Sequence, residues 1–212
     1  VSSSAASDVY KRQIFDSLKT RFPKKYLYDS PSVVVGVTES DIEKYGWPID
    51  DKYLLNTIQK LDKAETSSIV LDLYRNVGVG EGAKSLANYS RSNKKVISIF
   101  NVAEGIQSIP DFPLERMAFN DMPIDIDNVV RRDLVGVNRR KFKLGKEFVS
   151  VPMRMLEIHQ SLNKKSFNLE EKFYKNKISL IQNFSGGYTN VDSNGFQIFI
   201  NYPEKNYIPI YS

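Results

Sequence analysis

Residues 67–100 decide the fold of this chain, and they read SSIVLDLYRNVGVGEGAKSLANYSRSNKKVISIF. The apolar run from Ile69 to Leu73 predicts a buried strand with one acid inside it. The stretch from Ala83 to Ser90 predicts a helix, and VISIF at Val96 to Phe100 predicts the next strand. A strand, a helix and another strand in this order indicate a crossover unit with parallel strands.

The residues before this unit repeat the same alternation. SVVVGVT, from Ser32 to Thr38, predicts a strand buried on both faces. Thr38 and Asp41 have the spacing of a capping box, which starts a short helix that the GWP sequence terminates. Asp50 or Asp51 then caps a second helix, whose apolar residues at helical spacing are Leu54, Leu55, Ile58 and Leu61.

The second half of the chain has a different pattern. Residues 118–123 and 129–137 flank an acidic turn and predict an antiparallel hairpin, with Asp127 and Asn128 in the turn. We expect a helix at residues 148–162 and two late strands, at residues 177–182 and 196–202. The predicted fold class is therefore α/β, with a mostly parallel sheet flanked by helices and an antiparallel hairpin extension in the second half.

Composition restricts the function more than it identifies it. Hydrophobic residues make up 41% of the 212 residues and charged residues 26%, which is ordinary for a globular domain. The net charge of +5 is spread along the chain, so we expect no nucleic-acid partner. The absence of cysteine excludes disulfides, thiol catalysis and cysteine-ligated zinc sites. No stretch reaches the roughly 18 apolar residues of a membrane span.

The first 13 residues, VSSSAASDVYKRQ, differ from the rest because they are small, polar and aperiodic. We expect residues 1–13 to be a non-native or disordered leader, and residues 14–212 to form a single domain excised from a larger protein.

Polar residues follow the predicted parallel strands where each strand ends, and they are Thr38, Asp72 and Asn101. Ligands of open parallel sheets bind outside the carboxyl ends of the strands, so these side chains predict one polar floor. The favoured alternative for Asp72 is structural, because a buried carboxylate needs partners, and nearby helix N-termini would supply them.

The acidic turn offers two interpretations. Asp121, Asp125 and Asp127 could ligate a cation such as calcium, but their spacing does not fit an EF-hand loop. The favoured interpretation is that Arg131 and Arg132 neutralise the acids in bidentate pairs that hold the turn. We therefore predict no metal site and no cofactor.

Two single residues have a structural and a functional interpretation. Trp47, between Gly46 and Pro48, could line a ligand cavity, although filling the gap between helix and sheet is the commoner use. His159 lies on a predicted helix without a recognisable nucleophile, which favours a packing or surface role over a catalytic base. We recognise no catalytic motif in the sequence, so we predict that the chain is not an enzyme. The alternative is a small α/β hydrolase-like enzyme that pairs Asp72 with Asp121 or Asp192.

Four motifs resemble the CHASE sensor domains of the second type: VTESDIEKYGWPIDD (37–51), IVLDLYRN (69–76), FNDMPIDIDNVVRRDLVGV (119–137) and GGYTNVDSNGFQIFINY (186–202). The resemblance implies an extracytoplasmic sensory input domain of a bacterial membrane receptor, on the periplasmic side or cell surface. It implies a small-molecule or protein stimulus, and membrane helices that connect the domain to a cytoplasmic output domain.

A ligand or partner would act by binding one of two conformations preferentially. A homodimer, or a dimerisation platform without a small ligand, is a further hypothesis in the sensor class. The residues that we expect at a ligand site are Thr38, Asp41, Trp47, Asp72, Asn101, Asp121 and Arg131.

Overall fold

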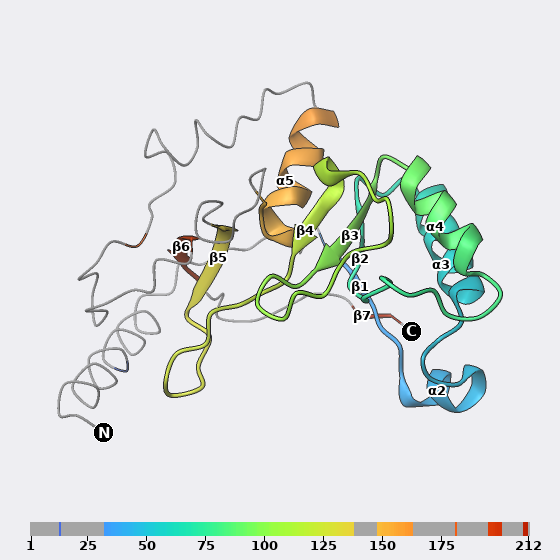
Figure 1. The fold of residues 1–212 in the computed structure, drawn as a ribbon, viewed down its shortest axis with the longest axis horizontal. Coiled ribbons are helices and arrows are strands. Elements are labelled where there is room, and N and C mark those ends of the chain that lie inside the picture. The colour runs from blue at the N-terminus through green and yellow to red at the C-terminus, as the bar shows by residue number, and fades with distance from the viewer. Residues whose placement is uncertain are drawn as a thin grey trace.

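A computed structural model describes residues 13, 32–137, 148–162, 181, 195–200 and 210–211. Its helices are α2 (Glu39–Tyr45), α3 (Asp51–Lys63), α4 (Ala83–Ser92) and α5 (Val151–Leu162), with a 3-10 helix η1 (Leu114–Arg116). Its strands are β1 (Val34–Val35), β2 (Ile69–Leu71), β3 (Val96–Phe100), β4 (Met117–Phe119), β5 (Arg132–Val137), β6 (Gly195–Phe199) and β7 (Ile210–Tyr211). The arrangement confirms the predicted α/β class (Figure 1).

The centre of the fold is a parallel sheet of three strands in the order β2-β3-β4. Helices α3 and α4 lie on one side of it and α5 on the other (Figure 1). The VISIF run forms β3 as predicted, and all five of its residues are buried, as is typical of a parallel strand covered on both faces. Ile58 of α3, Leu86 of α4 and Leu71 of β2 meet in one hydrophobic cluster, which holds the helices against the sheet.

The predicted antiparallel pairing of residues 118–123 with residues 129–137 was wrong. Residues 117–119 form β4, which pairs in parallel with β3, whereas β5 pairs antiparallel with β6 from the end of the chain. Residues 149–150 connect the two sheets, because Ser150 pairs with Phe119 of β4 and Val149 pairs with Gly136 of β5. The predicted antiparallel extension is present, but its two strands, β5 and β6, lie far apart in the sequence. Of the two late strands, the second corresponds to β6, and the first lies outside the described residues apart from Ile181.

The first strand was predicted to be buried on both faces, and this was wrong. Val34 and Val35 are 45% and 42% exposed, and β1 pairs in parallel with β7 in a separate sheet of two strands. The sequence pattern cannot distinguish an apolar run in a central sheet from one at an edge, because both are rich in β-branched residues.

The start of α3 shows how two adjacent acids divide their roles. Asp50 is the N-cap and accepts a hydrogen bond from the backbone N–H of Lys52 at 2.8 Å. Asp51 is buried and binds Nε of Arg75 at 2.7 Å, so it ties α3 to the segment after β2. A Cβ on Gly82 would lie 2.0 Å from the backbone nitrogen of Lys52, so this close approach requires glycine.

Arg116 fixes the C-terminal end of α4 beside β4. Its guanidinium donates hydrogen bonds to the backbone carbonyls of Ser90, Arg91, Asn93 and Val96. Burial lowers the pKa of Arg116, since the carbonyls that surround it carry no full negative charge. Among the described residues, no helix is long and apolar enough to cross a membrane.

Candidate functional site

The carboxyl ends of the three parallel strands bring polar residues from distant parts of the chain together. Asp72 follows β2, Asn101 follows β3 and Asn120 follows β4. Because parallel strands end at the same edge of a sheet, these residues lie at the edge where open α/β sheets bind ligands. With Tyr74, we call Asp72, Asn101 and Asn120 the carboxyl-edge cluster.

A chain of hydrogen bonds with one direction runs through the carboxyl-edge cluster. Nδ2 of Asn101 donates to Oη of Tyr74 at 3.3 Å, and that hydroxyl donates to Oδ1 of Asn120 at 2.9 Å. Nδ2 of Asn120 then donates to Oδ1 of Asp72 at 3.2 Å. Tyr74 and Asn120 each accept one hydrogen bond of this chain and donate the next, so the bonds polarise one another, and the chain ends on the carboxylate of Asp72.

Asp72 differs from its prediction in two ways. It lies one residue beyond β2 and is exposed, rather than being an acid inside a buried strand. Its hydrogen-bond donor is the side chain of Asn120, not a helix N-terminus. Water therefore reaches this carboxylate, and a solute with a hydrogen-bond donor or a positive charge can reach it in the same way.

Asp121 acts on the carboxyl-edge cluster indirectly, through the loop after β3. Its Oδ2 accepts the backbone N–H of Val102 at 2.9 Å, and its Oδ1 accepts that of Ala103 at 2.9 Å. Asp121, two residues after β4, thus holds the loop after β3. Within that loop, the backbone N–H of Glu104 donates a hydrogen bond of 2.7 Å to Oδ1 of Asn101. Asp121 positions the site by holding the loop that carries Asn101.

Thr38 and Asp41 lie in the predicted capping box at the start of α2, which the structure confirms. The backbone N–H of Thr38 donates to Asp41 at 2.9 Å, and the Thr38 hydroxyl donates to the same carboxylate at 2.6 Å. These hydrogen bonds, the hydroxyl foremost, lower the pKa of Asp41. Since β1 belongs to the separate sheet with β7, Thr38 does not follow a strand of the central sheet, and the predicted polar floor loses this member.

Trp47 does not fill a gap between helix and sheet, because its side chain is 58% exposed. It follows α2, whose residue Tyr45 packs against Tyr53 of α3 with the rings tilted by 47° and their centroids 4.5 Å apart. The structural use predicted for Trp47 was wrong. Its ring is available to solvent at the end of α2 away from the cap.

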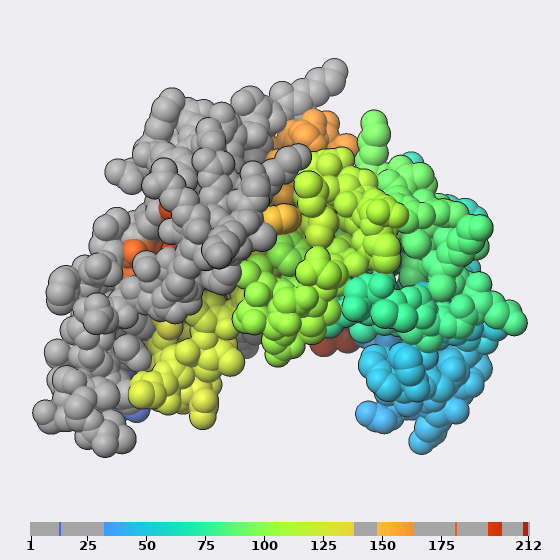
Figure 2. Space-filling view, viewed as in Figure 1, coloured from blue at the N-terminus to red at the C-terminus, as the bar shows by residue number. Residues whose placement is uncertain are grey.

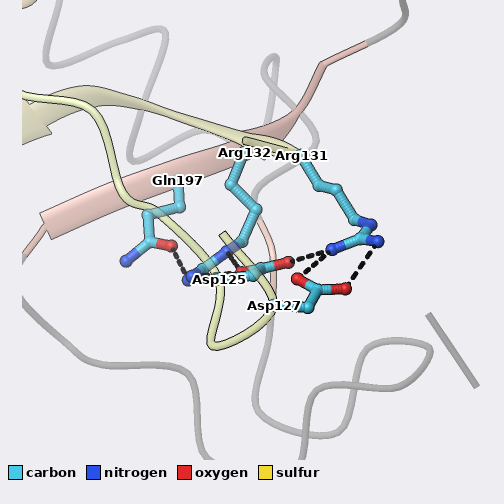
Figure 3. A network of polar contacts seen from close by, with 5 residues as sticks. All are labelled: Asp125, Asp127, Arg131, Arg132 and Gln197. Atoms are coloured by element: carbon cyan, nitrogen blue, oxygen red, sulfur yellow. Dashed lines mark hydrogen bonds and ion pairs between the residues drawn. The ribbon is translucent and has the colours of Figure 1, made fainter. Parts of the chain in front are cut away.

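Arg131 and Arg132 neutralise two of the three acids of the turn, as predicted (Figure 3). Arg131 forms a bidentate pair with Asp127, at 2.8 and 2.9 Å, and also reaches Oδ2 of Asp125 at 3.1 Å. Arg132 binds Oδ1 of Asp125 at 2.6 Å and the side chain of Gln197 on β6 at 2.7 Å. The hydrogen bonds from Arg131 lower the pKa of Asp127. We call these five residues the arginine clamp.

The acids of the described residues form no cluster that could hold a metal ion. In those residues, no group of three or more His, Asp and Glu side chains is placed to hold a metal ion. Both carboxylate oxygens of Asp121 accept backbone N–H groups, so Asp121 serves the loop after β3. Asp192, the other acid of the enzyme hypothesis, lies outside the described residues, and His159 is exposed on α5.

An open groove of about 490 Å³ is formed mainly by the loop after β3, and it is lined by Asn76, Gln107, Ser108, Ile109, Pro110, Asp111, Phe112 and Met117. Gln107 follows Ile106, which pairs with Asn101 of the carboxyl-edge cluster. A ligand at the edge would have an adjoining surface of mixed polarity.

Sequence reasoning missed two members of the carboxyl-edge cluster, Tyr74 and Asn120. Asn120 directly precedes Asp121, and Tyr74 lies two residues after Asp72. A polar residue at the carboxyl end of a third parallel strand was the signal for Asn120, but residues 118–123 were assigned to a hairpin. The correct pairing of β4 with β3 places Asn120 at the edge.

Comparison with known proteins identifies the family of this chain. Residues 3–212 match the model of the CHASE2 domain, the family that the four sequence motifs predicted. No curated protein and no solved structure matches this chain.

Proposed function

Because the chain belongs to the CHASE2 domain family, a family of extracytoplasmic sensory domains, we propose that it is the input domain of a bacterial transmembrane receptor. In this proposal, residues 14–212 form one sensory unit that performs no catalysis. A stimulus bound outside the membrane changes the conformation of the domain, and membrane helices pass the change to a cytoplasmic output domain.

We propose the carboxyl-edge cluster as the place where a small ligand binds. The observation that carries this proposal is the exposed carboxylate of Asp72 at the end of a hydrogen-bond chain from three consecutive strands. A ligand that donates a hydrogen bond or carries an ammonium group would compete with Asn120 for Asp72. Its binding would release Asn120 and so disturb the loops after β3 and β4 together.

Such a ligand must favour one of two arrangements of these loops, since equal affinity for both would shift nothing. In one arrangement Asn120 binds Asp72, and in the other the ligand binds Asp72 while Asn120 turns towards Tyr74 alone. The neighbouring Asp121 would transmit the change, because it holds the backbone of Val102 and Ala103.

A thermal-shift screen of the chain against calcium chloride, amino acids, polyamines and sugars tests the proposal. A compound that binds the folded state raises the melting temperature by mass action. We expect a shift for the wild type and for Glu43→Gln, which changes an exposed acid on α2. We expect no shift for Asp72→Asn, which keeps an oxygen to accept the hydrogen bond from Asn120.

Three results would contradict the binding site. The first is a flat response of the wild type to every compound, and the second is an equal shift in Asp72→Asn. The third is a large drop in the melting temperature of Asp72→Asn without ligand, which would give Asp72 a structural role. A compound that passes the screen is then added to the complete receptor, and its output activity is compared between wild type and Asp72→Asn.

A further inference from the structure

A chain of four hydrogen bonds crosses the carboxyl-edge cluster, and both of its ends fix its direction. At one end the backbone N–H of Glu104, which can only donate, bonds to Oδ1 of Asn101. At the other end the carboxylate of Asp72, which can only accept, receives the side-chain amide of Asn120. The two links between these ends run through the hydroxyl of Tyr74 in the same direction. Both amides are therefore held in one orientation, because turning either one over would place like groups against each other.

The fixed orientation leaves a donor and an acceptor side by side. Nδ2 of Asn120 carries two hydrogens, and its hydrogen bond to Asp72 uses one of them. Asp72 is exposed, and none of the described residues donates a hydrogen bond to its Oδ2. In the space-filling view, the loop after β3 (green) and the segment after β2 (blue-green) meet at the surface (Figure 2). A solute can therefore reach an N–H group and a carboxylate oxygen in one place.

We propose that the carboxyl-edge cluster, taken as the ligand site proposed above, selects a neutral polyhydroxyl compound such as a sugar or a cyclic polyol. A hydroxyl group donates and accepts at once. One hydroxyl, or two on neighbouring carbons, can thus donate to Asp72 and accept from the second N–H of Asn120. A hydroxyl with both functions satisfied loses little when it leaves water, whereas an unsatisfied one is costly to bury.

Ionic ligands match only one half of this pair. An ammonium group only donates, so it would suit Asp72 but would place its hydrogens against those of Asn120. A carboxylate or phosphate only accepts, so it would suit Asn120 but would be repelled by the charge of Asp72. A metal ion has no site here, since the described residues contain no group of three or more acids placed to hold one. The donor beside the acceptor therefore favours hydroxyl groups over ions of either sign.

The groove formed by the loop after β3 suits the rest of such a molecule. Its lining includes the side-chain amides of Asn76 and Gln107, which can also donate and accept. Asn76 lies two residues after Tyr74, and Gln107 follows Ile106, which pairs with Asn101. The apolar members of the lining can contact the C–H groups of a ring, as in small-molecule sites where a few polar groups orient a ligand on an apolar surface.

An NMR titration tests the ligand class, because proton–nitrogen correlation spectra resolve the side-chain amides of asparagine. The probes are glucose, ribose and myo-inositol as hydroxyl compounds, putrescine as a cation and succinate as an anion, at constant ionic strength. We expect saturable shifts of the Asn120 side-chain amide with at least one hydroxyl compound, and none with putrescine or succinate. Saturation separates binding from the general effect of polyols, which stabilise proteins because they are excluded from the protein surface.

Exchange of the two groups gives a matched set of variants, followed at the backbone amides of the loop after β3. Asp72→Asn leaves two amides and Asn120→Asp leaves two carboxylates, so each should raise the dissociation constant about tenfold or more. The double variant, Asp72→Asn with Asn120→Asp, again has one carboxylate beside one amide at unchanged net charge, and should restore most of the lost affinity. Glu43→Gln on α2 should bind like the wild type. Melting temperatures without ligand show that each variant folds.

Several results would overturn the proposal. Saturable shifts with putrescine alone or succinate alone, lost in Asp72→Asn, would make the ligand an ion and would leave the proposed ligand site standing. Equal binding of hydroxyl compounds by Asp72→Asn and the wild type would place them elsewhere on the chain. A folded double variant that binds no better than the single variants would show that the donor beside the acceptor does not select the ligand. A spectrum unchanged by every probe would contradict the ligand class and count against the proposed site as well.

Discussion

The side-chain amide of Asn120 donates a hydrogen bond of 3.2 Å to the carboxylate of Asp72, across 48 residues of sequence. This bond joins the ends of the two outer strands of the central sheet, β2 and β4, over the end of β3. The link from Asn120 back to Asn101 passes through a single hydroxyl, that of Tyr74.

Tyr74→Phe removes that hydroxyl and leaves Asn101 and Asn120 without their shared partner. We expect a loss of about 1 kcal/mol in the free energy of unfolding, the usual contribution of one partly buried hydrogen-bonding group. Urea denaturation measures it, with Tyr53→Phe on the exposed surface of α3 as the control. Equal midpoints for the two variants would mean that the cluster has no part in stability.

Asp125→Asn should destabilise the protein strongly, because it leaves two buried guanidinium groups beside a neutral amide. Removing one partner of a buried ion pair costs about 3–5 kcal/mol. Asp127→Asn should cost less, since its side chain is 16% exposed and Arg131 keeps Asp125. Chemical denaturation of both variants tests the order, and a greater loss for Asp127→Asn would contradict the arrangement of the arginine clamp.

Asp133 on β5 predicts a dependence of stability on pH. Burial raises its pKa above the ordinary value of 3.8, and a hydrogen bond from the backbone N–H of Leu134 offsets this only in part. The folded state therefore retains the proton to higher pH than the unfolded chain. The contribution of Asp133 to the stability of the folded state should therefore fall as the pH rises from 3.8 through the raised pKa.

Asp133→Asn removes this ionisation, so it should melt at a higher temperature than the wild type at neutral pH. The difference should vanish at about pH 3, where both states of the wild type hold the proton. Asp111→Asn, with an exposed carboxylate, should match the wild type at both pH values. An Asp133→Asn variant that is less stable than the wild type at neutral pH would show that the charged carboxylate stabilises the folded state.

Gly82→Ala should be destabilising, because Gly82 is the N-cap of α4 and lies against the start of α3. The added Cβ would lie 2.0 Å from the backbone nitrogen of Lys52, so α3 and α4 would have to separate. Overpacking of this kind costs about 1–3 kcal/mol. Gly36→Ala is the control, because its nearest neighbour would be at an ordinary contact distance of 3.9 Å. Thermal denaturation of the two variants should separate them clearly.

The sequence by itself determined the elements whose signals are local. The VISIF run gave β3 with its predicted bounds, and the run after Gly82 gave α4. The pairing of Thr38 with Asp41 fixed the start of α2, because a capping box needs residues only three positions apart. The family motifs and the pairing of the turn acids with Arg131 and Arg132 were equally readable, since these charges are close in sequence.

Only the tertiary structure decided which strands pair and which way each side chain faces. Residues 117–119 and 132–137 flank a turn, but β4 pairs with β3 and β5 pairs with β6. Pairing between strands that are distant in the chain leaves no local signal in the sequence. In the loop between β4 and β5, acids and isoleucines alternate, so either set could lie on the inside. The acids lie there because they pair with Arg131 and Arg132. That choice exposes Ile124 and Ile126, and the pairing of β4 places Asn120 beside Asp72.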